Sequence, residues 1–231
     1  MEKRTIHTDI LVAGSGPSGF AAAYTAAKSG MNVVIVEQSG DIGGISTSGL
    51  MSHWTGDCNS PVYHEILKRS AEKNEGRHRG VITNTIDPEK LKTLYLEMLY
   101  EKGVKIMLYT FACDAICENG AVKGVTVVNK SGYTDIFAKV IIDATGDGDI
   151  AFKAGAEFFM GRESDGKMQP ATIMFKVGAW IMTKPFSPAP SKPLFPPKKV
   201  SFKLWQKSFC PTPQGTFCFT KPPCPVLLPA T

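Results

Sequence analysis

The sequence predicts an α/β fold built on a parallel sheet, and three neighbouring segments predict it. Thr8–Ala13 and Asn32–Val36 are short runs of apolar and β-branched residues. Between them, Phe20–Ser29 has the alanine-rich composition of a helix that ends at Gly30. Continuous apolar strands, rather than alternating ones, are typical of a parallel sheet that is covered on both faces. The three segments therefore form one β-α-β unit of the usual size, about thirty residues.

Further elements are expected along the chain. Asp87 and Pro88 have the types preferred at a helix N-cap and first helical position, and Gly103 is placed to end that helix. Asn119-Gly120 and Ser131-Gly132 are turn dipeptides, so the strands around them form an antiparallel meander. The expected helices are 62–74, 88–102 and 150–154, and the expected strands are 105–110, 112–118, 121–129, 133–137, 139–143 and 171–177.

The composition changes near Gly178 and divides the chain in two. Residues 179–231 contain 12 of the 16 prolines and seven lysines, and they contain no Asp or Glu. Proline fixes φ and lacks a backbone N–H, so this density of proline disfavours a regular helix or a central strand. We predict a Rossmann-like domain over residues 5–178. We interpret residues 179–231 as an irregular Pro/Lys-rich tail that is disordered or non-native.

Charge and cysteine content narrow the class of protein. The net charge of +5 comes from the tail, because the rest of the chain has 19 basic and 21 acidic residues, with no basic patch that predicts a nucleic-acid partner. No apolar run is long enough to cross a bilayer, and residues 1–4 do not begin a secretory signal. We therefore predict a cytoplasmic protein without a membrane partner. Six cysteines without a C-x-x-C pair predict no metal or iron–sulfur site.

A G-x-G-x-x-G motif lies between the first predicted strand and the first predicted helix. Gly14 allows the tight turn, Gly16 lets a pyrophosphate approach the backbone, and Gly19 permits close packing of helix on strand. The helix N-terminus presents free N–H groups to the phosphates. Glu37 ends the second strand, where a carboxylate accepts hydrogen bonds from ribose hydroxyls and disfavours the 2′-phosphate of NADP. The motif predicts a dinucleotide site, without separating FAD from NAD.

Two later segments favour FAD. Gly43 and Gly44 can bring the backbone close to a long cofactor, and Thr47 adds a hydroxyl group. The sequence DATGDGD (143–149) lies at the carboxyl end of a predicted parallel strand. Open α/β sheets bind their ligands at that edge.

With these segments the chain resembles FAD-dependent oxidoreductases of the glutathione-reductase-like two-dinucleotide fold, which include flavoprotein subunits of fumarate reductase and heterodisulfide reductase. The matching stretches are DILVAGSGPSGFAAAYTAAKSGMNVVIVE (9–37), GGISTSGL (43–50), VIIDATGDGDIA (140–151) and GRESDGKMQPATIMFKVG (161–178). The resemblance implies an FAD-binding domain in which the adenine meets the backbone near Ala112. The residues expected to bind the cofactor are Gly14, Gly16, Pro17, Ser18, Gly19, Glu37, Gly43, Gly44, Thr47, Ala112, Ala144, Thr145, Gly146 and Asp147.

The resemblance leaves the reaction open. In such families the isoalloxazine and substrate sites depend on a later domain, so the chain is expected to be C-terminally truncated. The alternatives are a non-catalytic FAD-binding fragment, an NAD-binding dehydrogenase module, and a flavoprotein that passes electrons to an iron–sulfur partner. His53, His64 and His78 are isolated, and Cys58 has no partner thiol nearby in sequence, so we assign no catalytic residue. The substrate, the electron carrier and the oligomeric state are left open.

Overall fold

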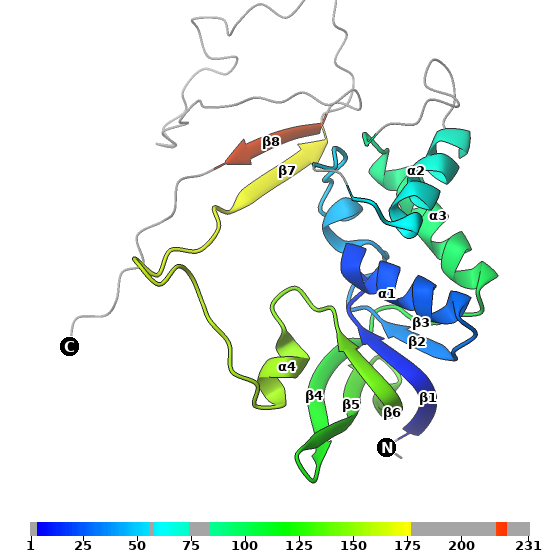
Figure 1. Cartoon of the computed structure of the whole chain (residues 1–231), viewed down its shortest axis with the longest axis vertical. Coiled ribbons are helices and arrows are strands. Elements are labelled where there is room, and N and C mark those ends of the chain that lie inside the picture. Colours follow the sequence, from blue (N-terminus) through cyan, green and yellow to red (C-terminus); the bar gives the residue numbers. More distant parts are fainter. Residues whose placement is uncertain (1–3, 56–57, 74–83, 177–215, 221–231) are drawn as a thin grey trace, which may run out of the picture. The chain divides into compact units, whose positions relative to one another are not determined.

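The computed structural model describes residues 4–55, 58–73, 84–176 and 216–220, in two units (Figure 1). The first unit, Met1–Phe159, contains a six-stranded sheet with the strand order β3-β2-β1-β6-β5-β4. Its strands are β1 (Arg4–Ala13), β2 (Val33–Val36), β3 (Lys105–Met107), β4 (Phe111–Glu118), β5 (Ala121–Asn129) and β6 (Gly132–Asp143). Its helices are α1 (Pro17–Lys28), the 3-10 helix η1 (Gly44–Ser46), α2 (Pro61–Lys73), α3 (Pro88–Glu101) and α4 (Asp149–Lys153).

The sheet has a parallel half and an antiparallel half. β1 pairs in parallel with β2 and β6, and β2 pairs in parallel with β3. β5 pairs antiparallel with both β4 and β6. The predicted α/β fold, with a parallel sheet and an antiparallel meander, is therefore confirmed.

β6 joins the two halves and corrects the sequence prediction. The strands expected at 133–137 and 139–143 form one continuous strand, because no glycine, proline or other turn residue separates them. Along one edge, β6 pairs with β5, with Gly124 opposite Phe137. Along the other edge it pairs with β1 up to Asp143, which lies opposite Ala13. The meander is thus continuous with the strand that carries the DATGDGD segment.

Helix α1 also differs from the sequence prediction. It begins at Pro17, three residues before the predicted start at Phe20, because proline is well suited to the first helical position. The earlier start places the N-terminus of the helix directly after the second glycine of the motif. It ends at Lys28, and Gly30 follows with φ +85°, as expected for a glycine after a helix end.

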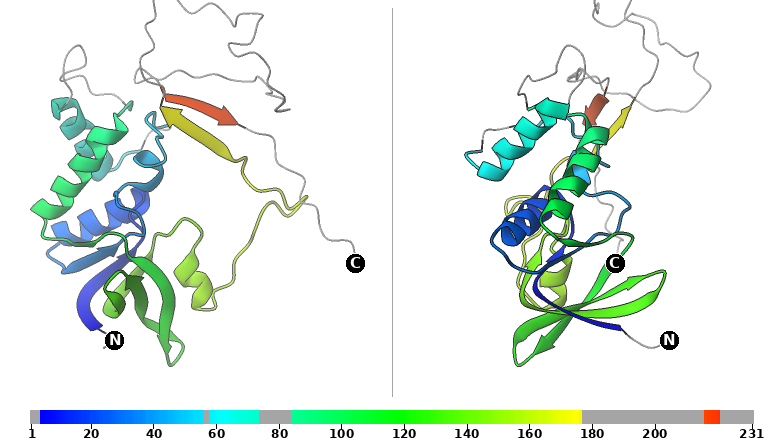
Figure 2. Two further views of the ribbon diagram at one scale, coloured as in Figure 1. Left: turned by 180° about the vertical axis from the view of Figure 1, so that it is seen from behind. Right: turned by 90° about the vertical axis from the view of Figure 1, so that its right-hand side faces the viewer.

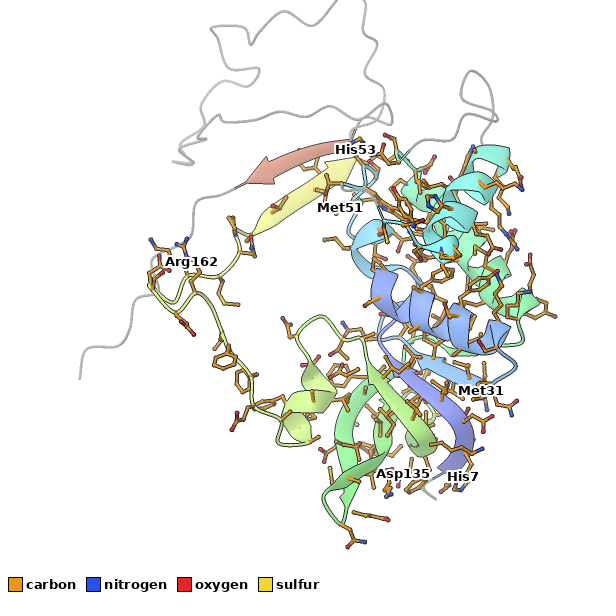
Figure 3. All side chains as sticks on the ribbon, viewed as in Figure 1. His7, Met31, Met51, His53, Asp135 and Arg162 are labelled. Carbon is orange, nitrogen blue, oxygen red and sulfur yellow. The ribbon has the colours of Figure 1, made fainter. Side chains whose placement is uncertain are left out.

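The two faces of the parallel strands bury different cores. α1 packs on β1 and β2, and α3 packs on α1 with α2 beyond it (Figure 2). Val12 faces this helical core, in which the rings of Phe20 and Tyr95 stack with centroids 3.8 Å apart. Leu11 and Ala13 face the second core, with apolar residues of β5 and β6. This alternation follows from the two-residue period of a strand. The side chains are drawn in Figure 3.

The second unit, Met160–Thr231, contains β7 (Thr172–Lys176) and β8 (Thr216–Thr220), which pair antiparallel. β7 matches the strand predicted at 171–177. β8 was not predicted, although its sequence TFCFT is rich in β-branched and aromatic residues. The rest of the predicted tail lies outside the described residues. Among the helices that the structure describes, none has the length and apolar character needed to span a membrane.

Candidate cofactor-binding site

A cavity of about 530 Å³ opens at the carboxyl ends of β1, β2 and β6. Backbone hydrogen bonds hold these strand ends together: the N–H of Gly14 donates to the Val36 carbonyl at 2.9 Å, and the N–H of Ala144 donates to the Ala13 carbonyl at 2.8 Å. The volume lies within the range of small-molecule sites, about 300–1,000 Å³. The cavity therefore has the size and the rigid frame of a ligand site.

The three glycines of the motif have different physical reasons to be glycine. A Cβ atom at Gly14 would lie 2.5 Å from the Ala144 carbonyl oxygen, and a Cβ at Gly19 would lie 2.0 Å from the Gly14 carbonyl oxygen. At both positions the backbone of the chain leaves no room for a side chain. A Cβ at Gly16 would have no atom of the described residues within 4 Å, and Gly16 has an ordinary φ of −58°. The same open space surrounds Gly146, so two glycines that line the cavity are not required by the packing of the chain.

The N-terminus of α1 faces this cavity through Gly16, Pro17 and Ser18. No side chain in the described part of the chain caps the helix. The N–H groups of its first turn therefore have no acceptor within the helix and carry the positive end of the helix dipole. An anionic group is the ligand that this end of the cavity favours.

Glu37 lines the cavity and is nearly buried, with 8% of its surface exposed. Its Oε2 accepts hydrogen bonds from the backbone N–H of Ser15 at 2.9 Å and from the Ser15 hydroxyl at 2.6 Å. Its Oε1 accepts from the N–H of Ser39 at 2.8 Å. Burial raises the pKa of Glu37, but these hydrogen bonds outweigh it and hold the pKa below its ordinary value. A carboxylate has about four acceptor positions, so the ionised Glu37 can accept one further hydrogen bond.

Asp143 organises the turn that follows β6. Its Oδ1 accepts from the N–H and the hydroxyl of Thr145 at 3.0 and 2.6 Å, and its Oδ2 accepts from the N–H of Ala151 at 2.8 Å. The Thr145 hydroxyl in turn accepts from the N–H of Asp149 at 2.8 Å. Burial opposes ionisation of Asp143, yet the bonds from Thr145 and Ala151 lower its pKa. Thr145 therefore acts mainly in shaping this wall of the cavity.

The double-glycine loop is attached to the motif by its backbone. The N–H of Gly43 donates to the Ser15 carbonyl at 2.8 Å, and a Cβ at Gly44 would lie 3.1 Å from the Cα of Gly16. The hydroxyl of Thr47 is buried and donates to the Ile42 carbonyl at 2.7 Å. Gly44 lines the cavity, whereas Gly43 and Thr47 shape the loop from behind.

The structure brings most of the predicted binding residues to one cavity. The predicted residues that line it are Gly14, Gly16, Pro17, Ser18, Glu37, Gly44, Ala112, Ala144, Thr145 and Gly146. The predicted residues that do not line it are Gly19, Gly43, Thr47 and Asp147. The lining residues that sequence reasoning missed are Ser15, Val36, Gln38, Ile45, Thr110, Phe111 and Asp149. Five of these carried a usable signal, because each is adjacent in sequence to a predicted site residue: Ser15, Val36, Gln38, Ile45 and Phe111.

The histidines that the structure describes do not line this cavity. His53 and His64 line neither this cavity nor the second one described below, and Nδ1 of His53 lies 2.9 Å from the Thr85 hydroxyl. His53 is labelled in Figure 3. His78 lies outside the described residues. None of the described histidines is therefore assigned to chemistry in this cavity.

The fold and the cavity are those of a dinucleotide-binding domain: a glycine turn, an uncapped helix N-terminus and an acidic residue at the end of the second strand surround one space. The chain belongs to the FAD dependent oxidoreductase family, whose sequence model matches residues 9–216. FAD is thus the cofactor that the family membership assigns.

The chain is also similar to curated relatives, and it shares its fold with a solved structure. The chain is 29% identical over 150 residues to a thiamine thiazole synthase of Methanococcus aeolicus, covering 61% of this chain and 56% of that one. It is 28% identical over 154 residues to a digeranylgeranylglycerophospholipid reductase of Methanothrix thermoacetophila, covering 60% and 39%. An anhydrotetracycline hydroxylase of Streptomyces rimosus shares its fold, with a TM-score of 0.51 and 13% identity over 73% of this chain and 36% of that chain.

The chain spans about half the length of these curated relatives. Their names describe different reactions, so the similarity to them selects no substrate. The cofactor is assigned by the family model.

Proposed function

We propose that the chain is the FAD-binding module of a flavin-dependent oxidoreductase, and that the cavity at the carboxyl edge of the sheet binds the FAD. The observation that carries the proposal is the open space at Gly16 and Gly146. The chain needs glycine at Gly14 and Gly19 for its own packing. It does not need glycine at Gly16 or Gly146, and a ligand that approaches the backbone there explains both.

The residues present fit the parts of FAD. The uncapped N-terminus of α1, next to Gly16, suits the pyrophosphate. The remaining acceptor position of Glu37 suits a ribose hydroxyl. Ala112 and Phe111 begin β4 and line the cavity together with Glu37, which suits the adenine; Phe111 is 49% exposed and offers an apolar ring face.

The chemistry belongs to the flavin, and the chain's residues bind and orient it. When bound, FAD supplies hydride and electron transfer. The carboxylate of Glu37 stays ionised at neutral pH because its pKa is lowered, and an ionised carboxylate repels the 2′-phosphate of NADP. The substrate stays open, and an iron–sulfur partner and the cytoplasmic location stay predictions.

The test is calorimetric titration of the 231-residue chain with FAD, FMN, ADP and NAD⁺. We expect one FAD per chain, and we expect ADP to compete with it, because ADP carries the adenosine and pyrophosphate that the cavity is proposed to bind. FMN lacks both adenosine and pyrophosphate and should bind much more weakly. Binding of NAD⁺ with no binding of FAD would support the dehydrogenase alternative and overturn the proposal.

A second measurement separates an active module from a non-catalytic fragment. The FAD-loaded chain is reduced chemically, and reoxidation of the flavin by a panel of electron acceptors is followed by absorbance. Reoxidation by an acceptor faster than that of free flavin supports an active module. Rates equal to those of free flavin for every acceptor support the fragment.

A further inference from the structure

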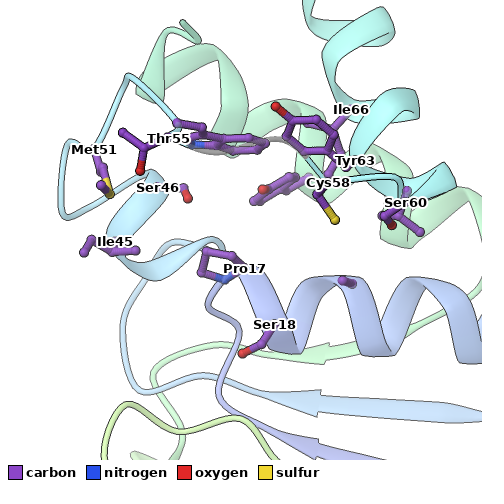
Figure 4. Close-up of a pocket in the computed structure, with 14 residues that line it drawn as sticks. Pro17, Ser18, Ile45, Ser46, Met51, Thr55, Cys58, Ser60, Tyr63 and Ile66 are labelled. Atoms are coloured by element: carbon purple, nitrogen blue, oxygen red, sulfur yellow. The ribbon is translucent and has the colours of Figure 1, made fainter. Parts of the chain in front are cut away.

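A second cavity, of about 470 Å³, lies between the first turn of α1, η1 and the residues around the start of α2 (Figure 4). Figure 4 shows Pro17 and Ser18 on one side of it and Cys58 and Tyr63 on the other. None of the described residues that line it carries a formal charge at neutral pH, and most are apolar or aromatic. A cavity of this lining favours a neutral ligand, because no opposite charge would compensate the loss of water around an ion.

The indole N–H of Trp54 is a hydrogen-bond donor that no described residue accepts from. Trp54 lines this cavity, and its Nε1 atom is buried without a hydrogen-bond partner among the described residues. The backbone around it is fixed, because the N–H of Trp54 donates to the Asn84 carbonyl at 2.9 Å and its carbonyl accepts from the Asn84 side chain at 2.8 Å. An indole N–H donates but cannot accept, so the group that would satisfy it is an acceptor oxygen or nitrogen.

The two cavities meet at shared residues. Pro17, Ser18 and Ile45 line both of them. A molecule in the second cavity would therefore lie beside one held in the first. The rings of Tyr63 and Trp54, whose centroids are 6.0 Å apart, give the second cavity an aromatic wall. Flat rings pack well against such a wall.

We propose that the second cavity is the substrate site, and that it takes a neutral, planar ring compound with a carbonyl oxygen as hydrogen-bond acceptor. The inference rests on the proposed function, because the first cavity must hold the flavin for its neighbour to hold the substrate. The ligand is expected to be neutral because the described lining carries no charge, and planar because two aromatic rings form one wall. It is expected to carry an acceptor oxygen because the Trp54 N–H has no partner among the described residues.

The probe is 2,3-dimethyl-1,4-naphthoquinone, which is neutral, planar and carries two carbonyl groups. Its quinone ring is fully substituted, so the thiol of Cys58 cannot add to it at a free position. It is titrated calorimetrically into the FAD-loaded chain, in parallel with a ring-sulfonated analogue of the same shape. We expect 1:1 binding of the neutral probe and at least tenfold weaker binding of the sulfonate. Equal affinities would overturn the neutral class.

Trp54→Phe keeps a ring and removes the N–H. We expect it to weaken binding of the probe by about tenfold, as for the loss of about one hydrogen bond. Without a ligand, the variant should unfold at the same temperature as the natural chain or higher, because it removes an unpaired buried donor. Unchanged affinity for the probe in this variant would overturn the role of Trp54.

Ala21→Leu tests the same cavity by its volume, because Ala21 lines the second cavity only. We expect it to block the probe and leave FAD binding intact. Loss of probe binding whenever FAD is bound would instead show that the flavin ring fills the second cavity, which overturns the proposal. A chain that binds FAD but never the probe also overturns it, whereas a chain that binds no FAD contradicts the proposed function itself.

Discussion

The carboxylate of Glu37 accepts hydrogen bonds from both the backbone N–H and the hydroxyl of Ser15, at 2.9 and 2.6 Å. This pair joins the end of β2 to the glycine turn after β1. Ser15 is completely buried, so the hydroxyl has no water to replace its partner. The position between two glycines of the motif therefore has a structural reason to be serine.

Ser15→Ala tests the hydrogen bond between the Ser15 hydroxyl and Glu37 through the pH dependence of stability. The pKa of Glu37 is lowered in the folded chain, so its contribution to stability is present above the unfolded-state pKa of about 4.3 and is lost as the pH falls through the folded-state pKa. We expect Ser15→Ala to lower the free energy of unfolding by about 2 kcal/mol at pH 7. The difference should shrink as the pH falls below about 4.3. Urea unfolding at pH 7 and pH 3 measures this difference in the free energy of unfolding. An equal difference at the two pH values would contradict the stabilising bond between Ser15 and Glu37.

Asp143→Asn tests the turn after β6. Asparagine has one acceptor oxygen, so an N–H group of the new side chain would face the N–H of either Thr145 or Ala151. We expect a loss of about 1.5 kcal/mol in the free energy of unfolding and weaker FAD binding. Chemical unfolding measures the loss of stability, and titration with FAD measures the change in affinity.

Asp147→Asn is the matched control, since it makes the same change in the same turn. Asp147 is exposed and does not line the cavity. We expect its effect on stability to stay within about 0.5 kcal/mol. If Asp147→Asn weakened FAD binding as much as Asp143→Asn, then the sequence prediction of a cofactor contact at Asp147 would be right and our assignment wrong.

Tyr24→Phe tests a hydrogen bond between α1 and α2 that lies away from both cavities. The buried Tyr24 hydroxyl donates to Oε1 of Glu65 at 2.7 Å, and burial, followed by Glu65, raises the pKa of Tyr24 to about 12. We expect a loss of about 1 kcal/mol in stability at pH 7 and no change in FAD affinity. Because the folded-state pKa is raised, this contribution is lost as the pH rises above about 10. Thermal unfolding at pH 7 and pH 11 measures the loss of stability and its pH dependence, and titration with FAD measures the affinity. An altered affinity for FAD would show that this hydrogen bond influences the cofactor site.

The β-α-β unit and the glycine turn could be predicted from the sequence because their signals are local. Buried parallel strands are continuous apolar runs, and a glycine motif between strand and helix has one common geometry. The continuity of β6 could not be predicted in this way. β1 pairs with nearly the whole length of β6, whereas β5 pairs only with its first half, and pairing of that kind is decided by the whole sheet.

The site was predictable where a residue's role depends on its own backbone, and less so where it depends on distant neighbours. Gly16 belongs to the first kind. Thr47 was expected at the cofactor, but its hydroxyl has a nearer acceptor in the Ile42 carbonyl, which only the folded loop shows. The second cavity was not predicted at all, because Pro17 and Trp54 are far apart in sequence and line one cavity only in the folded chain.

Gly16→Val tests the central claim, that this cavity binds FAD along the backbone of the motif. The structure has no atom within 4 Å of a Cβ at this position, so we expect the variant to fold with nearly unchanged stability. Gly19→Ala is the contrast, because its Cβ would lie 2.0 Å from a carbonyl oxygen, and it should destabilise the fold itself.

The measurement is the flavin content of natural and Gly16→Val chains, purified in excess FAD and checked for folding by circular dichroism. We expect about one FAD per natural chain and a folded, colourless Gly16→Val variant, since the side chain would occupy the place of the pyrophosphate. A folded Gly16→Val variant that retains FAD as well as the natural chain would contradict the central claim.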